Sequence, residues 1–477
     1  MSLADAPVPT LQARAEACAE RLLQADRVLL ASHIDADGLT SAAVASTALE
    51  RAGLPFETVF EKQLDADSIA GIAERDYDTV LFTDFGSGQL DIIADHEAAG
   101  DFTPVIADHH QPAEAETEFH LNPLLEGIDG ASEMSGAGAA YVLARALAAN
   151  SGQDERLDNR DLAALAVVGA VGDMQASTGE LHGANSQIVA DGVDAGVLEE
   201  TKDLAVYGKQ TRPLPKLLEF ASDVRIPGIT NDERGAVSFL DDVDVECRAD
   251  GSWKRWVDLT DDERQTVASA LVQHAVSRGV PAFKIDRLVG TTYVLREEEV
   301  GTELRDASEF STLLNATARY ERADVGLAVC LGDRASAYDR AKELLRNHRR
   351  NLSEGIEWVE RNGVTTEDHL QWFDSGEEIR ETIVGIIAGM SMGADGVSRN
   401  MPIIAFARKN DEETKVSSRG TGPLVSQGLD LSVVMREASQ AVGGDGGGHD
   451  VAAGATIPAG EEEAFIEHAD RIVGEQL

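Results

Sequence analysis

Four short apolar stretches in the first part of the chain each lead into acidic or histidine side chains. These polar residues are His33, Asp35 and Asp37 after stretch 27–32, Asp84 after 79–83, Asp108, His109 and His110 after 104–107, and Asp173 after 162–171. In an open α/β sheet, ligands bind where the strands finish at their carboxyl edge. The spacing therefore predicts that these side chains meet at one rim of a sheet and form a ligand site.

The side chains in this group offer only oxygen and nitrogen donors to a metal ion. The six expected ligands are His33, Asp35, Asp37, Asp84, His109 and Asp173. A set without thiolates suits Mn²⁺ or Mg²⁺ better than a structural zinc ion, and we expect two ions, Mn²⁺ in preference to Mg²⁺. Two ions roughly 3.5–4 Å apart activate a water and stabilise the entering and leaving oxygens at phosphorus. A single aspartate here would more often cap a helix, but the four clusters together favour the metal site.

A second group of candidate residues lies near the C-terminus and suits phosphate binding. Its members are Arg419, Gly446, Gly447, Gly448 and His449. Consecutive glycines form either a simple turn or a nest of backbone N–H groups that a phosphate can approach closely. A guanidinium bonds two phosphate oxygens at once, although a surface salt bridge explains an arginine equally well. We expect a phosphate-binding glycine loop over 443–449, with His449 as an extra donor.

The elements that must position the metal ligands alternate between strands and helices. The sequence predicts strands at 27–32, 56–60, 79–83 and 104–107, and helices at 11–26, 39–51, 64–74, 136–149 and 161–171. This alternation is typical of βαβ units around a parallel sheet. We therefore predict an N-terminal α/β domain over residues 1–200.

The remaining chain divides into two further parts. Residues 201–335 are less regular and predict a helical linker with a small inserted domain, and a long charged helix at 335–362 follows as a connector. Beyond it the sequence predicts helices at 377–390 and 431–441, strands at 402–408, 414–418 and 451–457, and a last helix. We expect residues 336–477 to form a smaller α/β domain, with a cleft between it and the first domain.

The charge of the chain is its most unusual compositional feature. Among 477 residues, 85 are acidic and 41 basic, which gives a formal net charge of -44, and only nine of the basic residues are lysine. The acidic residues are spread evenly along the chain and do not form an acidic tail. This even spread predicts a halophilic protein whose carboxylates stay hydrated in concentrated salt. In dilute salt such a surface would repel nucleic acid. In strong salt the repulsion is screened, so that metals, backbone donors and a few arginines must supply the binding.

The sequence shows no sign of a signal peptide, a transmembrane helix or a disulfide pattern. The first ten residues carry no basic residue and no apolar stretch, and no run of 18 apolar residues follows. Cys18, Cys247 and Cys330 stand far apart, without disulfide or metal-site spacing. We expect a cytoplasmic protein that does not associate with a membrane.

The motifs together resemble those of the DHH phosphoesterase superfamily. The matching stretches are 32–38, 83–84, 108–110 and 172–173, with the C-terminal glycine-glycine-glycine-histidine signature at 446–449 and an archaeal RecJ-like stretch at 314–319 and 324–326. The resemblance implies one metal on His33, Asp35 and Asp84. It implies a second on Asp37, Asp84, His109 and Asp173. Asp84 would bridge the two ions.

The resemblance also implies a role for the remaining motif residues and a reaction. As catalytic residues beside Asp84, His110 would face the scissile phosphate and Asp108 would hold an imidazole in the right tautomer. The protein would be a single-strand exonuclease that releases mononucleotides from DNA or RNA. The C-terminal residues would hold the strand, and the expected process is DNA repair. Bacterial RecJ carries an additional all-β domain for single strands, and no such stretch is evident in this sequence.

Two alternatives remain open at this stage. The first is an enzyme of the same superfamily that acts on oligoribonucleotides or cyclic dinucleotides. The second is a replication scaffold with a DHH fold and an unused site, which would bind a helicase-associated complex. Intact ligands in all four motifs count against a purely structural role.

Overall fold

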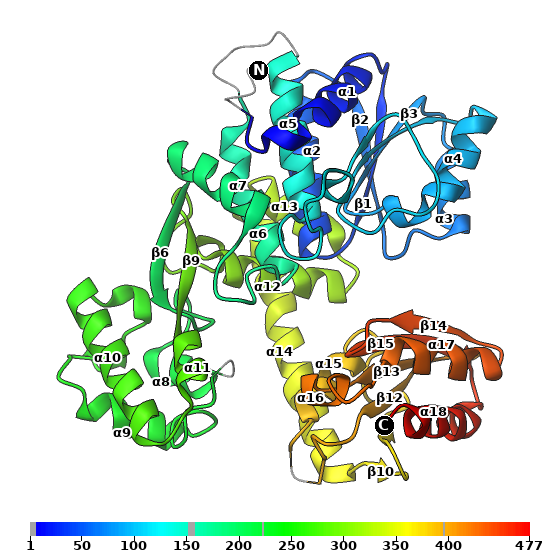
Figure 1. Cartoon of the computed structure of the whole chain (residues 1–477). Coiled ribbons are helices and arrows are strands. Elements are labelled where there is room, and N and C mark those ends of the chain that lie inside the picture. The colour runs from blue at the N-terminus through cyan, green and yellow to red at the C-terminus, as the bar shows by residue number, and fades with distance from the viewer. Residues whose placement is uncertain (1–5, 151–157, 222–223, 395) are drawn as a thin grey trace. The chain divides into compact units, whose positions relative to one another are not determined.

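The computed structural model describes residues 6–150, 158–221, 224–394 and 396–477. The chain divides into two compact units, Met1–Lys342 and Glu343–Leu477 (Figure 1). Of the ten N-terminal residues on which the targeting prediction rests, the first five lie outside the described residues. No helix within the described ranges combines the length and the apolarity that crossing a bilayer would require.

The first unit is built on a five-stranded parallel sheet, in the order β2-β1-β3-β4-β5. Its strands are β1 (Val28–His33), β2 (Phe56–Glu61), β3 (Thr79–Thr83), β4 (Thr103–Ala107) and β5 (His120–Leu121). All five residues of β3 are buried, as expected for a strand covered on both faces by helices. The predicted N-terminal parallel sheet is confirmed.

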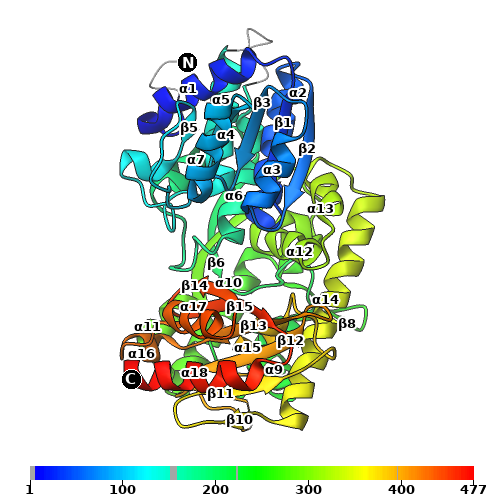
Figure 2. The same ribbon diagram turned by 90° about the vertical axis from the view of Figure 1, so that its right-hand side faces the viewer.

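Helices cover both faces of this sheet. They are α1 (Gln12–Leu23), α2 (Ala36–Arg51), α3 (Ala66–Ala73), α4 (Leu90–Ala99) and α5 (Gly136–Asn150). Helix α6 (Ala163–Gly172) packs on α2 and α5, and α7 (Gly183–Asp194) packs on α6. Helices α3 and α4 lie on one face, with α1, α2 and α5 on the other (Figures 1 and 2). The alanines and glycines of α5 and α6 let both helices approach α2 closely. Because of this close approach, the N-terminus of α5 and the C-terminus of α6 lie near the start of α2.

A two-stranded antiparallel ribbon, β6 (Leu198–Leu204) with β9 (Val289–Leu295), leads to a small helical cluster and back. The cluster holds α8 (Leu214–Glu219), α9 (Glu233–Asp242), α10 (Asp261–Ser277), α11 (Ala282–Ile285) and the short hairpin β7 (Arg248–Ala249) and β8 (Ser252–Trp253). It has its own apolar core, in which Trp256 is fully buried. Helices α12 (Ala307–Arg319) and α13 (Ala323–Cys330) then return to pack on α2.

Short 3-10 turns join several of these elements. They are η1 (Pro9–Leu11), η2 (Ser87–Gln89), η3 (Pro123–Glu126), η4 (Arg160–Leu162), η5 (Trp256–Asp258), η6 (Asp286–Leu288) and η7 (Glu303–Arg305). The 27-residue helix α14 (Ser336–Asn362) runs from the first unit into the second.

The second unit is a mixed six-stranded sheet, in the order β10-β11-β12-β13-β15-β14. Its strands are β10 (Thr365–Thr366), β11 (Gln371–Asp374), β12 (Ile403–Arg408), β13 (Glu413–Arg419), β14 (Asp445–Gly448) and β15 (Ala452–Pro458), and its helices are α15 (Val384–Ser391), α16 (Gly422–Val425), α17 (Leu431–Ala441) and α18 (Glu462–Gln476). Helices α17 and α18 pack on one face around Phe406 and Phe465. Helix α15 and the end of α14 pack on the other. The predicted C-terminal α/β domain is confirmed.

Two local predictions for this unit are wrong. The glycine stretch is not a loop, because Asp445–Gly448 forms the edge strand β14, paired antiparallel with β15. A Cβ on Gly446 would lie 2.8 Å from the carbonyl oxygen of Met435 in α17, so glycine is required for the strand to pack against that helix. The helix predicted to begin at residue 377 begins only at Val384, after turns that follow Gly376 with its φ of +52°.

Candidate metal centre

The register of the parallel sheet brings three strand ends together. β3 lies between β1 and β4, with Thr83 opposite both Ser32 and Ala107. Because the strands run in the same direction, the residues that follow these positions leave the sheet at the same edge. They are His33, Asp84 and Asp108, one from each predicted motif.

The first group of possible metal ligands consists of His33, Asp35 and Asp84. His33 Nδ1 lies 3.3 Å from Asp35 Oδ2 and 3.6 Å from Asp84 Oδ2. Asp35 is also the N-cap of α2, since its Oδ1 accepts the backbone N–H of Gly38 at 3.0 Å. The capping interpretation and the ligand interpretation of this aspartate are thus compatible, because each uses a different oxygen.

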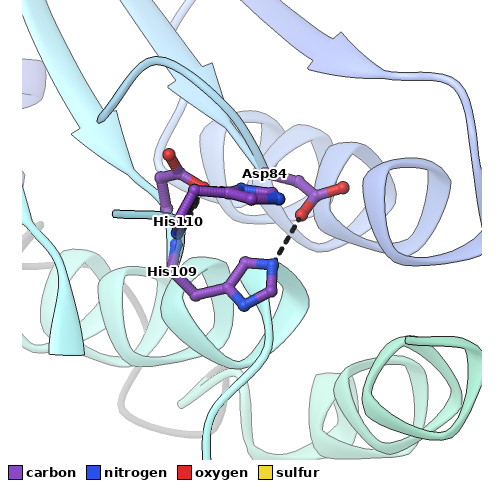
Figure 3. A group of neighbouring side chains, drawn as sticks. Asp84, His109 and His110 are labelled. Atoms are coloured by element: carbon purple, nitrogen blue, oxygen red, sulfur yellow. Dashed lines mark hydrogen bonds and ion pairs between the residues drawn. The ribbon is translucent and has the colours of Figure 1, made fainter. Parts of the chain in front are cut away.

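The second group consists of Asp37, His109 and Asp173. His109 Nε2 lies 3.8 Å from Asp37 Oδ2 and 3.3 Å from Asp84 Oδ1 (Figure 3). One oxygen of Asp84 therefore faces His33 and the other faces His109. This arrangement matches a carboxylate that bridges two metal positions, and it unites the six residues chosen as ligands from the sequence.

A carbonyl group fixes which nitrogen of His109 can bind a metal. His109 Nδ1 donates a hydrogen bond to the Gly130 carbonyl oxygen at 2.6 Å, which leaves Nε2 free to act as a ligand. Gln175 donates to the same carbonyl at 2.9 Å and to Asp173 Oδ2 at 2.8 Å. Gln175 thereby ties Asp173 to His109. Sequence reasoning missed it, because nothing distinguishes a single glutamine after a helix.

Small residues around the cluster leave room for its carboxylates. The N-terminus of α5 donates two backbone N–H groups to Asp37, from Gly136 at 2.7 Å and from Ala137 at 3.0 Å. A Cβ on Gly136 would lie 2.5 Å from Asp84 Oδ1, and one on Gly169 would lie 2.4 Å from Asp37 Oδ1. Asp84 itself has a φ of +59°, a backbone conformation that non-glycine residues rarely adopt.

Buried carboxylates and imidazoles change one another's pKa values strongly. Burial disfavours the imidazolium form, but the neighbouring Asp35 and Asp84 outweigh it and raise the pKa of His33 to about 11. Asp84 likewise outweighs burial and raises the pKa of His109 to about 11. Burial and the repulsion of Asp84 raise the pKa of Asp37 well above its ordinary value, and burial raises the pKa of Asp173 to about 6.

The raised pKa values of His33 and His109 mean that the carboxylates around them stabilise a positive charge at each imidazole. Without a metal, protons on the imidazoles supply that charge, and divalent ions would supply it when the protons leave. The donors are hard oxygens and imidazole nitrogens held by hydrogen bonds, so the residues present fit Mn²⁺ or Mg²⁺.

Asp108 orients His110, and these two residues also form a third possible ligand group with Asp84 and His109. Its Oδ1 accepts His110 Nδ1–H at 2.8 Å, and its Oδ2 accepts the backbone N–H of Ser87 at 2.9 Å. Asp108 is fully buried, whereas the side chain of His110 is 55% exposed. Burial opposes ionisation, but hydrogen bonding to His110 holds the pKa of Asp108 down at about 2. His110 therefore presents its Nε2 to the open side of the cluster.

Helix α12 contributes two further residues. Asn315 Oδ1 accepts the backbone N–H of Ala36 at 3.1 Å and so fixes the start of α2 between Asp35 and Asp37. One turn later, Arg319 is exposed and interacts electrostatically with Asp35. Within the described part of the chain its guanidinium makes no hydrogen bond or ion pair. Both residues belong to the stretch 314–319, whose resemblance to RecJ-like sequences does not by itself assign a role to either side chain.

The C-terminal candidates lie at the same end of three neighbouring strands, β13, β15 and β14, of the second unit's sheet. Arg419 at the end of β13 lies opposite Ala452, and the N–H of His449 donates to the carbonyl oxygen of the same Ala452 at 2.9 Å. Hydrogen-bonded pairs alternate along an antiparallel ladder, so the N–H groups of Gly446 and Gly448 point away from β15. Because β14 is the edge strand, these donors face outward. The metal ligands belong to the first unit and this edge to the second.

Three family models match successive parts of the chain. The model described as DHH family, N-terminal domain, matches residues 27–170, which hold every proposed metal ligand except Asp173. The DHH-CID domain model matches residues 206–289, the helical cluster with most of the linker that precedes it. The DHHA1 domain model matches residues 370–475, which include Arg419 and the glycine strand.

Known proteins resemble the chain over nearly its whole length. It is 28% identical over 454 residues to the uncharacterized protein MJ0831 of Methanocaldococcus jannaschii, covering 94% of this chain and 93% of that one. A manganese-bound exonuclease RecJ structure is 18% identical, with a TM-score of 0.59 over 98% of this chain and 94% of that one. CDC45 from Entamoeba histolytica is 11% identical, with a TM-score of 0.63 over 97% of both chains. The chain spans only 55% of the longer RecJ of Thermus thermophilus (17% identity, TM-score 0.61 over 98% of this chain).

Proposed function

The chain belongs to the DHH superfamily and has a RecJ-like fold, and we propose that it is a metal-dependent phosphodiesterase. In this proposal it removes mononucleotides from single-stranded DNA or RNA. The observation that carries the proposal is the position of Asp84. Its two oxygens face two ligand groups, 3.6 Å from His33 Nδ1 and 3.3 Å from His109 Nε2. A carboxylate shared between two ligand groups is what a two-metal phosphoesterase requires.

The two ions, held by the six ligands described above, would supply an activated water and charge stabilisation at phosphorus. The chain's own residues position the reacting groups. Asp108 holds His110 with its free Nε2 directed to the open side of the cluster, where it can donate a proton or a hydrogen bond to the substrate. Arg319, beside Asp35, supplies a guanidinium at the same opening for a phosphate oxygen.

The second unit supplies contacts suited to the substrate strand. The outward N–H groups of Gly446 and Gly448 and the side chain of His449 offer donors to phosphate groups, and Arg419, two strands away at the end of β13, offers a charged one. With a net charge of -44 the remaining surface repels nucleic acid, so these few donors must provide most of the attraction.

The test is to digest single-stranded DNA and RNA, labelled at either end, with Mn²⁺ in molar KCl. We expect labelled mononucleotides from one end from the earliest time points, and no attack on a circular single strand. The protein with Asp84→Asn serves as the inactive control. Release of internal fragments or cleavage of the circle would contradict an exonuclease.

The same assay separates the alternatives. An enzyme for oligoribonucleotides would act on strands of two to five nucleotides and leave longer ones intact, and a cyclic-dinucleotide phosphodiesterase would linearise the cyclic substrate. The likeness to CDC45 favours a replication scaffold as the second candidate function. Complete inactivity on all substrates with both ions bound would favour that scaffold.

A further inference from the structure

A cavity of about 740 Å³ lies within the first unit, and its lining includes Val171 and Met174, which lie on either side of the metal ligand Asp173 in the chain. One wall is the segment that follows the metal ligand Asp173, and the other is formed by the β6–β9 ribbon and helix α11. We call it the ribbon cavity and define it by Met174, Thr178, Lys209, Phe283, Thr291 and Thr292. Its volume lies in the range of small-molecule sites and exceeds the size of one nucleoside.

Apolar side chains stand exposed around the ribbon cavity. Met174, next in the chain to Asp173, is 72% exposed, and Phe283 is 62% exposed. Met174 also has a φ of +62°, which is unfavourable for a residue of this kind. This conformation occurs in the turn that ends α6, where the N–H of Met174 donates to the carbonyl oxygen of Val171 at 3.2 Å. Exposed apolar groups gathered around a concave site indicate a ligand.

The lining of the cavity holds as many basic as acidic side chains, although the chain as a whole is strongly acidic. Lys209 is buried, with Nζ hydrogen-bonded to Thr292 Oγ1 and 3.5 Å from Asp203 Oδ2. The lining as a whole holds three basic side chains (Lys202, Lys209 and Arg287) and three acidic ones (Glu180, Asp286 and Asp306). The whole chain has about twice as many acids as bases. An approaching anionic strand is thus repelled less here than over the general surface.

Resting on the proposed function, we propose that the ribbon cavity binds a nucleobase of the substrate strand, adjacent to the phosphate at the metal centre. A base is a planar ring with polar edges. Phe283 and Met174 offer apolar surface for its faces, while Thr178, Thr291 and Lys209 offer partners for its edges. Val171 and Met174 line the cavity and lie on either side of Asp173 in the chain, so one wall belongs to the segment that carries this metal ligand.

Binding of a labelled single strand in molar KCl tests this proposal. Phe283→Ala removes an exposed ring, so we expect the protein to remain folded, and to bind the strand on the order of 10-fold more weakly. Phe220→Ala is the matched control, because Phe220 is 50% exposed in the same unit but lies outside the cavity. It should bind as the wild type does. A second variant, Ser177→Trp, places a large ring at the exposed rim and should weaken binding by obstruction.

Strands that lack one base show which nucleotide enters. We expect one position at which an abasic residue weakens wild-type binding as much as Phe283→Ala does. The abasic strand and Phe283→Ala together should then weaken binding no further, because both remove the same contact. A 2-aminopurine at this position should change its fluorescence on binding to the wild type and not to Phe283→Ala.

Two results would overturn the inference. The first is that Phe283→Ala and Ser177→Trp both bind the strand as tightly as the wild type does. The second is that, at every abasic position, the loss of affinity caused by the missing base adds fully to the loss caused by Phe283→Ala. Either would leave the proposed function standing if the wild type still digests single strands. If the wild type neither binds nor digests any single strand, the proposed function fails, and this inference fails with it.

Discussion

Replacing Asp84 by asparagine is the most direct test of the shared carboxylate. Asp84 is 3% exposed, and its two oxygens face His33 and His109. Asparagine has the same shape and tolerates a positive φ, so Asp84→Asn should keep the fold. Alanine at a φ of +59° would add about 1–2 kcal/mol of backbone strain. The asparagine variant therefore separates the loss of charge from the loss of structure.

The expected loss of activity follows from the position of this one charge. Metal ions stabilise the transition state by several kcal/mol, and both ligand groups depend on Asp84. If about 3–4 kcal/mol of this stabilisation is lost, kcat/KM should fall about 100- to 1000-fold. The pKa values of His33 and His109 should fall as well, because each loses an anionic neighbour.

The assay combines three measurements on the same preparation: Mn²⁺ binding by calorimetry, digestion of a single strand, and thermal melting. Asp91→Asn is the control, since Asp91 is an exposed aspartate in the first turn of α4, outside the cluster. The reasoning is refuted if Asp84→Asn binds two Mn²⁺ ions and digests the strand at a rate within a fewfold of the wild type.

Three further outcomes are expected. The pKa values of His33 and His109 are raised to about 11, so both imidazoles carry protons near pH 7 without a metal. Mn²⁺ must displace a proton from each of them, and its affinity should rise with pH. Calorimetry in buffers of different ionisation heat counts these protons, and a pH-independent affinity would contradict the assignment. The charge of -44 should make the fold unstable in dilute buffer and stable again in molar KCl, and an unchanged circular dichroism spectrum at low salt would oppose the halophile prediction. Arg419→Ala and His449→Ala should each weaken oligonucleotide binding by roughly 1.5–3 kcal/mol, or about 10- to 100-fold. The effect should be far smaller on a nitrophenyl phosphodiester, and equal losses on both substrates would show that this edge supports the metal centre itself.

Much of the first unit was predictable because each signal is local. Strand β3 follows from a buried apolar run and was predicted with its observed bounds, and the strand that ends in His33 was predicted to within one residue. Parallel strands separated by helices place their carboxyl ends at one edge. The meeting of His33, Asp84 and His109 therefore follows from the pattern and was anticipated.

Residues that act through a distant partner were not predictable. Gln175 matters only because the Gly130 carbonyl lies within its reach, 45 residues away in sequence. Asn315 matters because α12 returns to the start of α2. The glycine stretch reads as a turn, and becomes a strand only when β15 and α17 lie beside it.

The sequence by itself determined the chemistry of this protein: which donors are present, that they lack thiolates, and that they follow strands and helices that finish at a common rim. These are properties of residue type and of short-range periodicity, which the chain carries in any conformation. Only the tertiary structure decided the roles. It turned one oxygen of Asp84 toward each ligand group, assigned the free nitrogen of His109 through Gly130, and opened the ribbon cavity next to Asp173. Such roles depend on distances between segments far apart in the chain, and those distances are set by packing.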